Sequence, residues 1–477
     1  MTLGDLLPVL PEARVEGPVD RPLSALRYDS RRVEAGDIFF AWKGAGFDGH
    51  QFVPDACRRG AAAVVLEREL ERPENAAFVR VPDARRALAL LAGRYYGNPA
   101  AKLEMVGVTG TNGKTTTAFV VQHLLGGKIG LLGTVHYQTG AETLPASRTT
   151  PEGSDLQEML AKMVAAGCRA AVMEVSSHAL DQGRVAGIGF AAAVFTNLTP
   201  DHLDYHPTME AYFEAKRLLF SQSRAAVVNL DDPYGRRLAG ELAGEVIAFS
   251  PSGAAAAPLR AENVRTTPRG TEFELVWKEL RLPVRMPLLG DFNVANVLGA
   301  LGACLALGRP VEELAARLES LPAVPGRLER FGKEGQPSVV VDYAHTEDAV
   351  RKALATLRQL RPKRLAVVLG CGGSRDRTKR PRMAAAAVEL ADRVYFTSDN
   401  PRGESQEQIF ADMRAGVPAE APAAWIADRR EAIARAIAEA GPDDLVCIAG
   451  KGHESTQEIA GVHHPFSDRD VVGEILA

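Results

Sequence analysis

The chain has 477 residues, of which 46% are hydrophobic and 24% are charged, and its formal net charge is −4. This composition excludes a disordered or fibrous chain, and the length exceeds a single hydrophobic core. We therefore expect a soluble globular protein with about two to four domains. The slight acidity gives no general attraction for nucleic acid or for anionic membranes, so any anion must be bound by local clusters.

The five cysteines are odd in number and far apart, without a C-x-x-C pair, which argues against a disulfide framework and a zinc site. The first residues, MTLGDLLPVLPEARVEG, lack a basic leader and a sustained apolar core, so no signal peptide is predicted. The apolar stretch NVANVLGALGACLALG is shorter than the ~20 residues that span a bilayer and predicts a core helix. We expect a cytoplasmic monomer with small-molecule partners, no nucleic acid and no membrane.

Short β-branched runs alternate with helical stretches rich in alanine and leucine along the chain, which predicts the α/β class with parallel sheets. Chain-breaking residues at Gly97 to Pro99 and at Pro322 to Gly326 divide the chain into three predicted domains, residues 1–100, 101–323 and 324–477. Polar and apolar residues alternate in segments of 260–290, which predicts an antiparallel appendage to the central domain.

Polar residues gather directly after the predicted strands. In open parallel sheets, ligands bind at the carboxyl ends of the strands, so these segments are the candidate sites. The segments are TGTNGKTTT (109–117), Glu174 with SSHAL, NLTPDHLDYH (197–206), DYAH (342–345), CGGSRDRTKRP (371–381), SDNPR (398–402) and KGHES (451–455).

The segment VGVTGTNGKTTTAF resembles a phosphate loop, but the usual spacing would place the first glycine where Val108 stands. Its glycines allow a tight turn whose N–H groups face phosphate, followed by a helix from about Gly113. Lys114 would then meet the β- and γ-phosphates, and Thr115 would offer a hydroxyl to Mg²⁺. The alternative is a plain glycine-rich turn between a strand and a helix.

Glu174 ends an apolar strand, where a carboxylate serves either a salt bridge or a metal ion. His202 lies after another strand, and a His–Glu pair could complete a second divalent-ion site. Lys216, in the helix TMEAYFEAKRLLF, has by pattern alone the character of a solvated surface lysine. These three residues alone leave the structural and the functional roles open.

Ten motifs occur together and in order: TGTNGKTTT, TTPE, MEVSSHAL, FTNLTPDHLDYHPTMEAYFEAK, GDFNVANVLGA, PGRLER, VDYAHTEDA, GCGGSRDRTKRP, SDNPRGE and AGKGHE. Together they closely resemble the Mur ligases of peptidoglycan synthesis, over essentially the whole chain. Within that family they resemble the branch that adds the third amino acid to UDP-N-acetylmuramoyl-L-alanyl-D-glutamate. The resemblance implies the three-domain Mur ligase architecture, with a UDP-sugar-binding domain, a central P-loop ATPase-like parallel sheet and a C-terminal Rossmann-like domain.

The resemblance also implies ATP and Mg²⁺ as cofactors, with a shortened phosphate loop and a lysine that reacts with CO₂ to form a carbamate, here Lys216. The implied catalytic residues are Lys114, Glu174, His202 and Lys216, and the implied metal ligands are Thr115, Glu174, His202 and the Lys216 carbamate. The implied ATP contacts are Gly110, Thr111, Asn112, Gly113, Lys114, Thr115, Thr116, Asn296, Arg327 and Asp342.

The implied reaction transfers the γ-phosphoryl group of ATP to the D-glutamyl carboxylate, and an amine then attacks the resulting acyl phosphate. The implied contacts to the nucleotide-sugar dipeptide are Tyr28, Ser30, the loop from Gly44 to His50, Thr149, Thr150, Ser176, Gln182 and Arg184. For the loop residues near the N-terminus, turn formation is the alternative role.

The amino acid to be added is meso-diaminopimelate or L-lysine, which differ by one distal carboxylate. A guanidinium group binds such a carboxylate well, and Arg402 in DNPR provides one, so we expect diaminopimelate. A surface salt bridge is the alternative role of Arg402. The implied pocket comprises Arg375, Asp399, Asn400, Pro401, Arg402, Gly450 and Glu454. The alternative functions for the chain are a P-loop ATPase switch, a D-alanyl-D-alanine-adding ligase and a folylpolyglutamate ligase.

Overall fold

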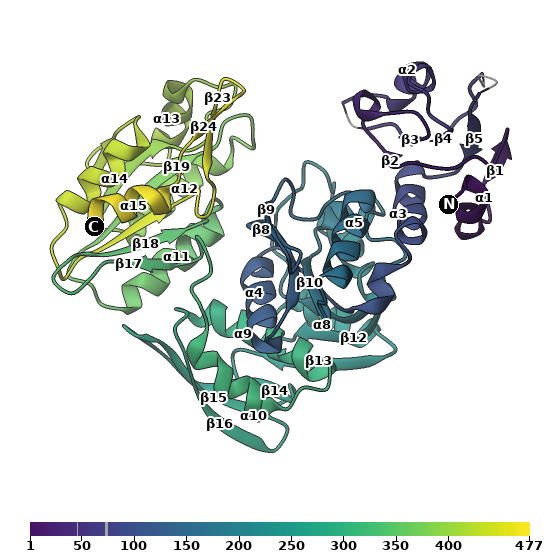
Figure 1. Ribbon diagram of the computed structural model, residues 1–477. Coiled ribbons are helices and arrows are strands. Elements are labelled where there is room, and N and C mark those ends of the chain that lie inside the picture. The colour runs from purple at the N-terminus through teal and green to yellow at the C-terminus, as the bar shows by residue number, and fades with distance from the viewer. Residues whose placement is uncertain (45, 72–74) are drawn as a thin grey trace. The chain divides into compact units, whose positions relative to one another are not determined.

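A computed structural model of the protein describes residues 1–44, 46–71 and 75–477. These form two compact units, Met1–Arg260 with Ala295–Leu314 and Ala261–Val294 with Ala315–Ala477. Three larger sheets are present in them, and helices pack on the strands of each, so the predicted α/β class is confirmed (Figure 1). The predicted domain boundaries after residues 100 and 323 stay a prediction. In the described part of the chain, no helix is both long and apolar enough to cross a bilayer.

The N-terminal sheet has the strand order β1-β5-β4-β3-β2. Strand β1 pairs antiparallel with β5, and the other strand pairs are parallel, so the chain returns to the same edge of the sheet between successive parallel strands. The elements are α1 (Leu3–Leu6), η1 (Leu7–Val9), β1 (Arg14–Glu16), β2 (Leu26–Arg27), η2 (Ser30–Arg32), β3 (Ile38–Ala41), η3 (Gly49–Phe52), α2 (Val53–Arg58), β4 (Ala63–Leu66), β5 (Ala77–Arg80) and α3 (Ala84–Tyr95).

The central sheet of the first unit contains the strand order β13-β12-β11-β6-β10-β7-β8-β9. The pairs from β13 to β7 are all parallel, and β6 lies between β10 and β11. The elements are η4 (Pro99–Lys102), β6 (Glu104–Thr109), α4 (Lys114–Leu125), β7 (Ile129–Leu132), β8 (His136–Gln138), β9 (Thr143–Pro145), α5 (Gly153–Ala165), β10 (Ala170–Glu174), α6 (Ser177–Asp181), β11 (Phe190–Phe195), α7 (Met209–Arg217), η5 (Phe220–Gln222), β12 (Ser223–Asn229), α8 (Pro233–Glu241), β13 (Glu245–Ser250), α9 (Asp291–Ala306) and α10 (Val311–Arg317). The segments after β6, β10 and β11 therefore meet at one edge of the sheet.

Both faces of this sheet are covered, which explains why its strands are continuous apolar runs and not alternating ones. On one face, Met105 and Met173 join a core with residues of α5, α6, α7 and α8. On the other face lies α9, where a Cβ added to Gly302 would meet Cγ1 of Val227 at 2.5 Å. The apolar stretch around residues 293–308 is thus a core helix, as its length predicts.

The second unit contains the predicted antiparallel segment, in which β15 pairs with β16 from Thr271 opposite Met286 to Trp277 opposite Leu280. The six-stranded sheet in this unit has the strand order β17-β18-β22-β19-β20-β21, parallel except for the edge strand β17. The elements are β14 (Leu259–Thr267), β15 (Gly270–Trp277), β16 (Leu280–Met286), η6 (Leu318–Ser320), β17 (Glu329–Phe331), β18 (Ser338–Asp342), α11 (Glu347–Gln359), β19 (Leu365–Cys371), α12 (Lys379–Leu390), β20 (Arg393–Ser398), α13 (Gln406–Arg414), β21 (Ala423–Trp425), α14 (Arg429–Ala438), β22 (Leu445–Ala449), β23 (Thr456–Ile459), β24 (Val462–Pro465) and α15 (Asp468–Leu476).

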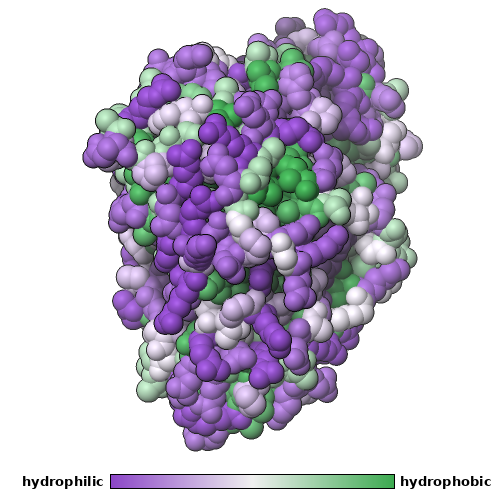
Figure 2. Space-filling view, turned by 90° about the vertical axis from the view of Figure 1, so that its left-hand side faces the viewer, coloured by the Kyte–Doolittle hydropathy of each residue, from purple (hydrophilic) through white to green (hydrophobic). Residues whose placement is uncertain are grey.

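Alternate residues of this parallel sheet enter two cores, one with α11, α12 and α13 and the other with α14 and α15. Hydrophilic residues cover most of the face shown in Figure 2, and hydrophobic residues gather in a limited patch near its middle.

Inside the second unit, Arg429 and Asp468 form an ion pair at 2.7 Å with both side chains fully buried. The same guanidinium donates to the carbonyl oxygens of Ser398 and Ala449, which end β20 and β22.

Candidate functional site

The loop after β6 is shaped by two glycines with positive φ, Gly110 at 142° and Gly113 at 89°. A Cβ on Gly110 would lie 1.9 Å from Oγ1 of Thr196, and one on Gly113 would lie 2.1 Å from Oδ1 of Asn296. Only glycine fits at both positions, and α4 begins directly afterwards at Lys114. The unusual glycine spacing is therefore a requirement of this loop, whose helix N-terminus suits phosphate.

Two lysines converge on this loop. The Nζ atom of Lys114 donates to the carbonyl oxygens of Gly110 (2.9 Å) and Thr111 (2.8 Å), and Nζ of Lys216 donates to the same Gly110 oxygen at 2.8 Å. Lys216 is only 1% exposed, and its Nζ lies 4.5 Å from the ring centroid of Tyr212. Burial lowers the pKa of Lys216 well below its ordinary value, and the charge of Lys114 acts in the same direction. The environment therefore favours a neutral, nucleophilic amine.

Glu174, at the end of β10, is 1% exposed and accepts three hydrogen bonds. They come from Oγ1 of Thr115 at 3.0 Å, and from the backbone nitrogen and Oγ1 of Thr134 at 2.8 and 3.2 Å. The structure thus brings together Thr115 and Glu174, two of the predicted metal ligands. Within the described residues, no cluster of three or more His, Cys, Asp and Glu side chains is arranged to hold a metal ion.

His202 lies in the segment after β11 with a positive φ of 53°. Burial lowers the pKa of His202, the neighbouring Asp201 raises it, and the charge of Lys114 lowers it further. His202 therefore belongs to the surroundings of the two lysines.

His202 is also part of an aromatic cluster that the sequence analysis did not identify, formed with His178, Tyr205, His206 and Tyr212. The rings of His178 and Tyr205 are 4.2 Å apart, and those of His206 and Tyr212 are stacked at 5.2 Å. Nε2 of His206 lies 3.0 Å from Oγ of Ser177. Burial lowers the pKa of His178 to about 4. The sequence signal that could have identified this cluster is the histidines of SSHAL and DHLDYH, because both segments follow predicted strands.

The half-buried His178 predicts that the protein is less stable in acid. Between pH of about 6.5 and about 4, the unfolded chain binds a proton at this position that the folded chain does not. The free energy of unfolding should therefore decrease as pH falls through this window, as measured by urea unfolding at several pH values. His178→Gln should flatten the decrease, whereas His464→Gln, at an exposed position of β24, should leave it unchanged. An unchanged slope in His178→Gln would contradict the assignment.

The predicted contacts to the nucleotide-sugar dipeptide gather beside Glu174. Oγ1 of Thr150 donates to the Glu174 carbonyl oxygen at 2.8 Å, and the carbonyl oxygen of Thr150 accepts from Arg184 at 2.9 Å. Arg184 also donates to Gln182 at 2.6 Å. Oγ1 of Thr149 lies 3.1 Å from Oγ1 of Thr134, and Oγ of Ser176 lies 3.5 Å from Oγ1 of Thr150. These five predicted residues therefore form one connected network.

The N-terminal candidates reach the central sheet through Tyr28, whose hydroxyl donates to Asp155 of α5 at 2.7 Å. Ser30 is buried in η2. In the predicted loop from Gly44 to His50, residue 45 lies outside the described residues. Nδ1 of His50 lies 2.7 Å from Asp48, so part of this loop is held by its own side chains.

A buried carboxylate with three arginines was missed by the sequence analysis. Glu152 is 1% exposed, and its Oε1 forms ion pairs with Arg85 at 3.0 Å, Arg148 at 2.7 Å and Arg184 at 3.2 Å. Burial lowers the pKa of Arg184 to about 10, against the effect of Glu152. Three guanidinium groups around one carboxylate leave positive charge in excess, which suits an anionic ligand.

In the second unit, predicted amino-acid contacts meet after β20 and β22. Nδ2 of Asn400 donates to Glu454 at 2.8 Å, and a Cβ on Gly450 would lie 2.7 Å from Oδ2 of Asp399. Arg402 donates to the carbonyl oxygen of Gly373 at 2.9 Å and pairs with Glu458 at 3.2 Å. Pro401 precedes Arg402 and is buried. Arg375 is exposed after β19, and no hydrogen bond among the described residues connects it to the other predicted pocket residues.

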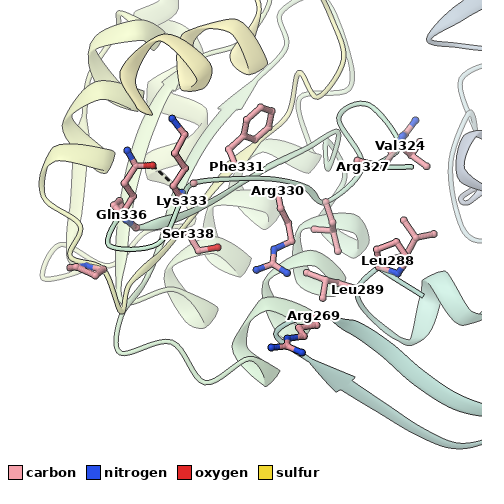
Figure 3. Close-up of a pocket in the computed structure, with 16 residues that line it drawn as sticks. Arg269, Leu288, Leu289, Val324, Arg327, Arg330, Phe331, Lys333, Gln336 and Ser338 are labelled. Carbon is pink, nitrogen blue, oxygen red and sulfur yellow. Dashed lines mark hydrogen bonds between the residues drawn. The ribbon is translucent and has the colours of Figure 1, made fainter. Parts of the chain in front are cut away.

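Predicted ATP contacts of the second unit lie near a cavity of about 470 Å³ (Figure 3). Arg327 lines it and stacks over the ring of Tyr343 at 4.7 Å, while Oδ2 of Asp342 accepts from the Leu328 nitrogen at 2.7 Å. Basic and apolar residues line the cavity, and the basic ones are Arg269, Arg327, Arg330 and Lys333.

Comparison with known proteins matches three successive parts of the chain. Residues 22–96 match the Mur ligase family, catalytic domain, residues 108–304 the Mur ligase middle domain, and residues 326–452 the Mur ligase, glutamate ligase domain. A relative from Geobacillus kaustophilus is 46% identical and the alignment covers 99% of this chain and 98% of the relative. The chain belongs to the Mur ligase family. The predicted resemblance is thereby confirmed, and this Mur ligase is an enzyme that joins two substrates.

The relative from Geobacillus kaustophilus is named UDP-N-acetylmuramoyl-L-alanyl-D-glutamate–2,6-diaminopimelate ligase. A Mur ligase of the same name from Pseudomonas aeruginosa is 46% identical over 96% of both chains. A solved structure of a ligase with this name is 35% identical, with a TM-score of 0.72, and covers 100% of this chain and 98% of its own. A MurF ligase from Thermotoga maritima in complex with ADP, 22% identical over 95% of this chain and 96% of its own, has a TM-score of 0.64 and shares the fold.

Proposed function

We propose that this Mur ligase joins meso-diaminopimelate to UDP-N-acetylmuramoyl-L-alanyl-D-glutamate with ATP, through an acyl phosphate, in cytoplasmic synthesis of peptidoglycan precursors. We further propose that it acts as a monomer of three domains with the boundaries predicted above. The observation that carries the proposal is the meeting of the glycine-shaped loop, the buried Glu174 and the buried Lys216 at one sheet edge. The names of the 46% identical relatives support the choice of substrates.

The donor set fits magnesium in part. Oγ1 of Thr115 and the carboxylate of Glu174 are hard oxygen donors 3.0 Å apart, which Mg²⁺ prefers. His202 would be a further ligand, whereas an amine at Lys216 would suit this ion poorly. Bound there, Mg²⁺ would neutralise charge on the transferring phosphoryl group.

Lys216 fits the same site once it is a carbamate. The lone pair of its neutral Nζ attacks the carbon of CO₂, an N–C bond forms, and one proton leaves for solvent. The product carries anionic oxygens in place of a basic nitrogen. Burial supports this step because it favours the neutral amine that the reaction needs.

The remaining residues position the reactants. Backbone N–H groups of the loop and Lys114 would hold the phosphates, while Asn296, Arg327 and Asp342 would contact the adenine, a phosphate and the ribose. The network of Thr149, Thr150, Ser176, Gln182 and Arg184 would hold the muramoyl dipeptide so that its free carboxylate faces the γ-phosphate.

L-Lysine remains a second candidate for the added amino acid, because Arg402 already pairs with Glu458 at 3.2 Å. That pairing partly neutralises the guanidinium that a second carboxylate would need. We favour diaminopimelate, because the guanidinium group of Arg402 has further N–H donors besides those directed at Glu458 and at the Gly373 carbonyl oxygen.

The proposed function is tested by phosphate release from ATP and Mg²⁺ in the presence of the nucleotide-sugar dipeptide. The reaction is run with meso-diaminopimelate, with L-lysine and without an amine, and products are identified by mass. Release that requires diaminopimelate and yields the tripeptide is expected. Release that requires lysine would overturn the choice of amine, and release indifferent to any amine would indicate an ATPase.

Arg402→Met is expected to lower kcat/KM for diaminopimelate by roughly 10- to 100-fold, because one charged hydrogen-bonding partner of the distal carboxylate is lost. The value for L-lysine should change much less, so the preference between the two amines narrows. Arg430→Met is the matched control, because Arg430 is exposed and pairs with Glu474, away from the proposed pocket residues. An equal loss for both amines would contradict the recognition of a carboxylate by Arg402.

A further inference from the structure

Lys451 is fully buried directly after β22, and all three protons of its ammonium group are used. Nζ donates to Oδ1 of Asn400 at 3.1 Å, to Oε2 of Glu454 at 2.8 Å and to the carbonyl oxygen of Thr456 at 2.7 Å. Burying an ammonium group is costly unless each donor has an acceptor. This lysine therefore holds one fixed position.

The side chains that Lys451 contacts belong to the proposed amino-acid pocket. Oδ1 of Asn400 accepts from Lys451 and from the Glu458 nitrogen at 3.0 Å, while its Nδ2 donates to Oε2 of Glu454 at 2.8 Å. Two donors on Oδ1 and an acceptor at Nδ2 specify one orientation of the amide. Lys451 and Glu458 together therefore determine which end of Asn400 faces Glu454.

The carboxylate of Glu454 is likewise oriented by these contacts. Its Oε2 receives both the Lys451 ammonium and the Asn400 amide. No side chain of the described residues donates to its Oε1, which is the atom left to accept a hydrogen bond from a ligand. An oxygen so placed suits the ammonium group of a diamino acid.

We infer that Lys451 is a positioning residue for the incoming amino acid, which acts by fixing Asn400 and Glu454 in the orientation that receives its distal ammonium group. This inference rests on the proposed function. Lys451 does not itself contact the substrate in this role, since its three donors are occupied by protein acceptors.

The test compares Lys451→Met with the wild-type enzyme in the phosphate-release assay. Methionine keeps most of the length of the side chain but has no ammonium group, so Asn400 and Glu454 lose their common donor. We expect KM for diaminopimelate to rise roughly 10- to 100-fold, with smaller changes in kcat and in KM for ATP and for the nucleotide-sugar dipeptide. Equal losses in all of these constants would overturn the inference.

Two control variants separate positioning from general destabilisation. Lys352→Met removes an exposed lysine of the same unit that pairs with Asp348, and it should leave KM for diaminopimelate unchanged. Ile433→Ala opens the core beside α14 and should lower the unfolding temperature without a selective rise of that KM. A selective rise in Ile433→Ala as well would show that loss of stability suffices, which would overturn the inference.

A double-mutant cycle with Glu454→Gln gives a readout that a purely structural role would not produce. If Lys451 acts through Glu454, the effect of Lys451→Met on KM should be much smaller in the Glu454→Gln background. Full additivity would contradict the inference. A wild type that requires L-lysine would overturn the choice of amine in the proposed function alone, because the same cycle measured with L-lysine still tests Lys451.

Discussion

Lys216→Met is expected to lower kcat by roughly 10²- to 10³-fold, the loss typical when one preorganised electrostatic contact to a transition state is removed. The proposed cause is loss of the carbamate, which only an amine can form with CO₂. Methionine retains most of the buried volume, and Lys114 still donates to the Gly110 carbonyl oxygen. The phosphate loop should therefore keep its structure while the chemical step fails.

The measurement is steady-state phosphate release, together with unfolding to show that Lys216→Met remains folded. The wild type should lose activity in CO₂-depleted buffer and regain it with bicarbonate, and Lys216→Met should respond to neither. Lys128→Met is a matched control, because Lys128 is exposed and its ammonium group donates to the Ala166 carbonyl oxygen. Turnover of Lys216→Met near the wild-type value would contradict the assigned role.

Glu174→Gln is expected to lower kcat/KM for ATP by roughly 10²- to 10³-fold and to raise the Mg²⁺ concentration needed for half-maximal activity. The amide has the shape of the carboxylate and can still accept from the Thr134 nitrogen, while its NH₂ group can donate to the hydroxyl of Thr115. The substitution thus removes a charge and leaves most of the local packing.

The measurement is activity as a function of Mg²⁺ concentration at saturating substrates. Glu142→Gln is the control, because Glu142 is exposed and forms an ion pair with the exposed Lys162. A variant at Glu174 with wild-type Mg²⁺ dependence would mean that this carboxylate is a structural partner of Thr115 and Thr134 only.

The α/β class and the central helix were predictable, because alternating strand and helix patterns and a long apolar run are local properties of the sequence. The phosphate loop was recognisable for the same reason, since its glycines are required within four residues, from Gly110 to Gly113. The family was recognisable from ordered motifs and is confirmed by the comparisons. The roles of the individual site residues stay predictions.

What the sequence pattern did not predict depends on which strands are neighbours. Lys216 has the pattern of a surface residue on α7, and it is buried because β6 lies beside β11 and the helix returns over the loop. The arginines around Glu152 come from three separate segments, at positions 85, 148 and 184. Lys451 stands within a recognised motif, yet its function as a donor depends on Asn400, which lies 51 positions away.

The buried ion pair of Arg429 and Asp468 has a consequence for the synthesis of the protein on the ribosome. Arg429 donates to the ends of β20 and β22, but its carboxylate partner lies in α15, 39 positions later in the chain. Until that helix has emerged, the guanidinium lacks the partner that makes its burial tolerable, and an unpaired buried charge costs about 3–5 kcal/mol. The core around Arg429 can therefore be completed only after α15 has emerged, while segments that precede Arg429 in the chain can fold ahead of it.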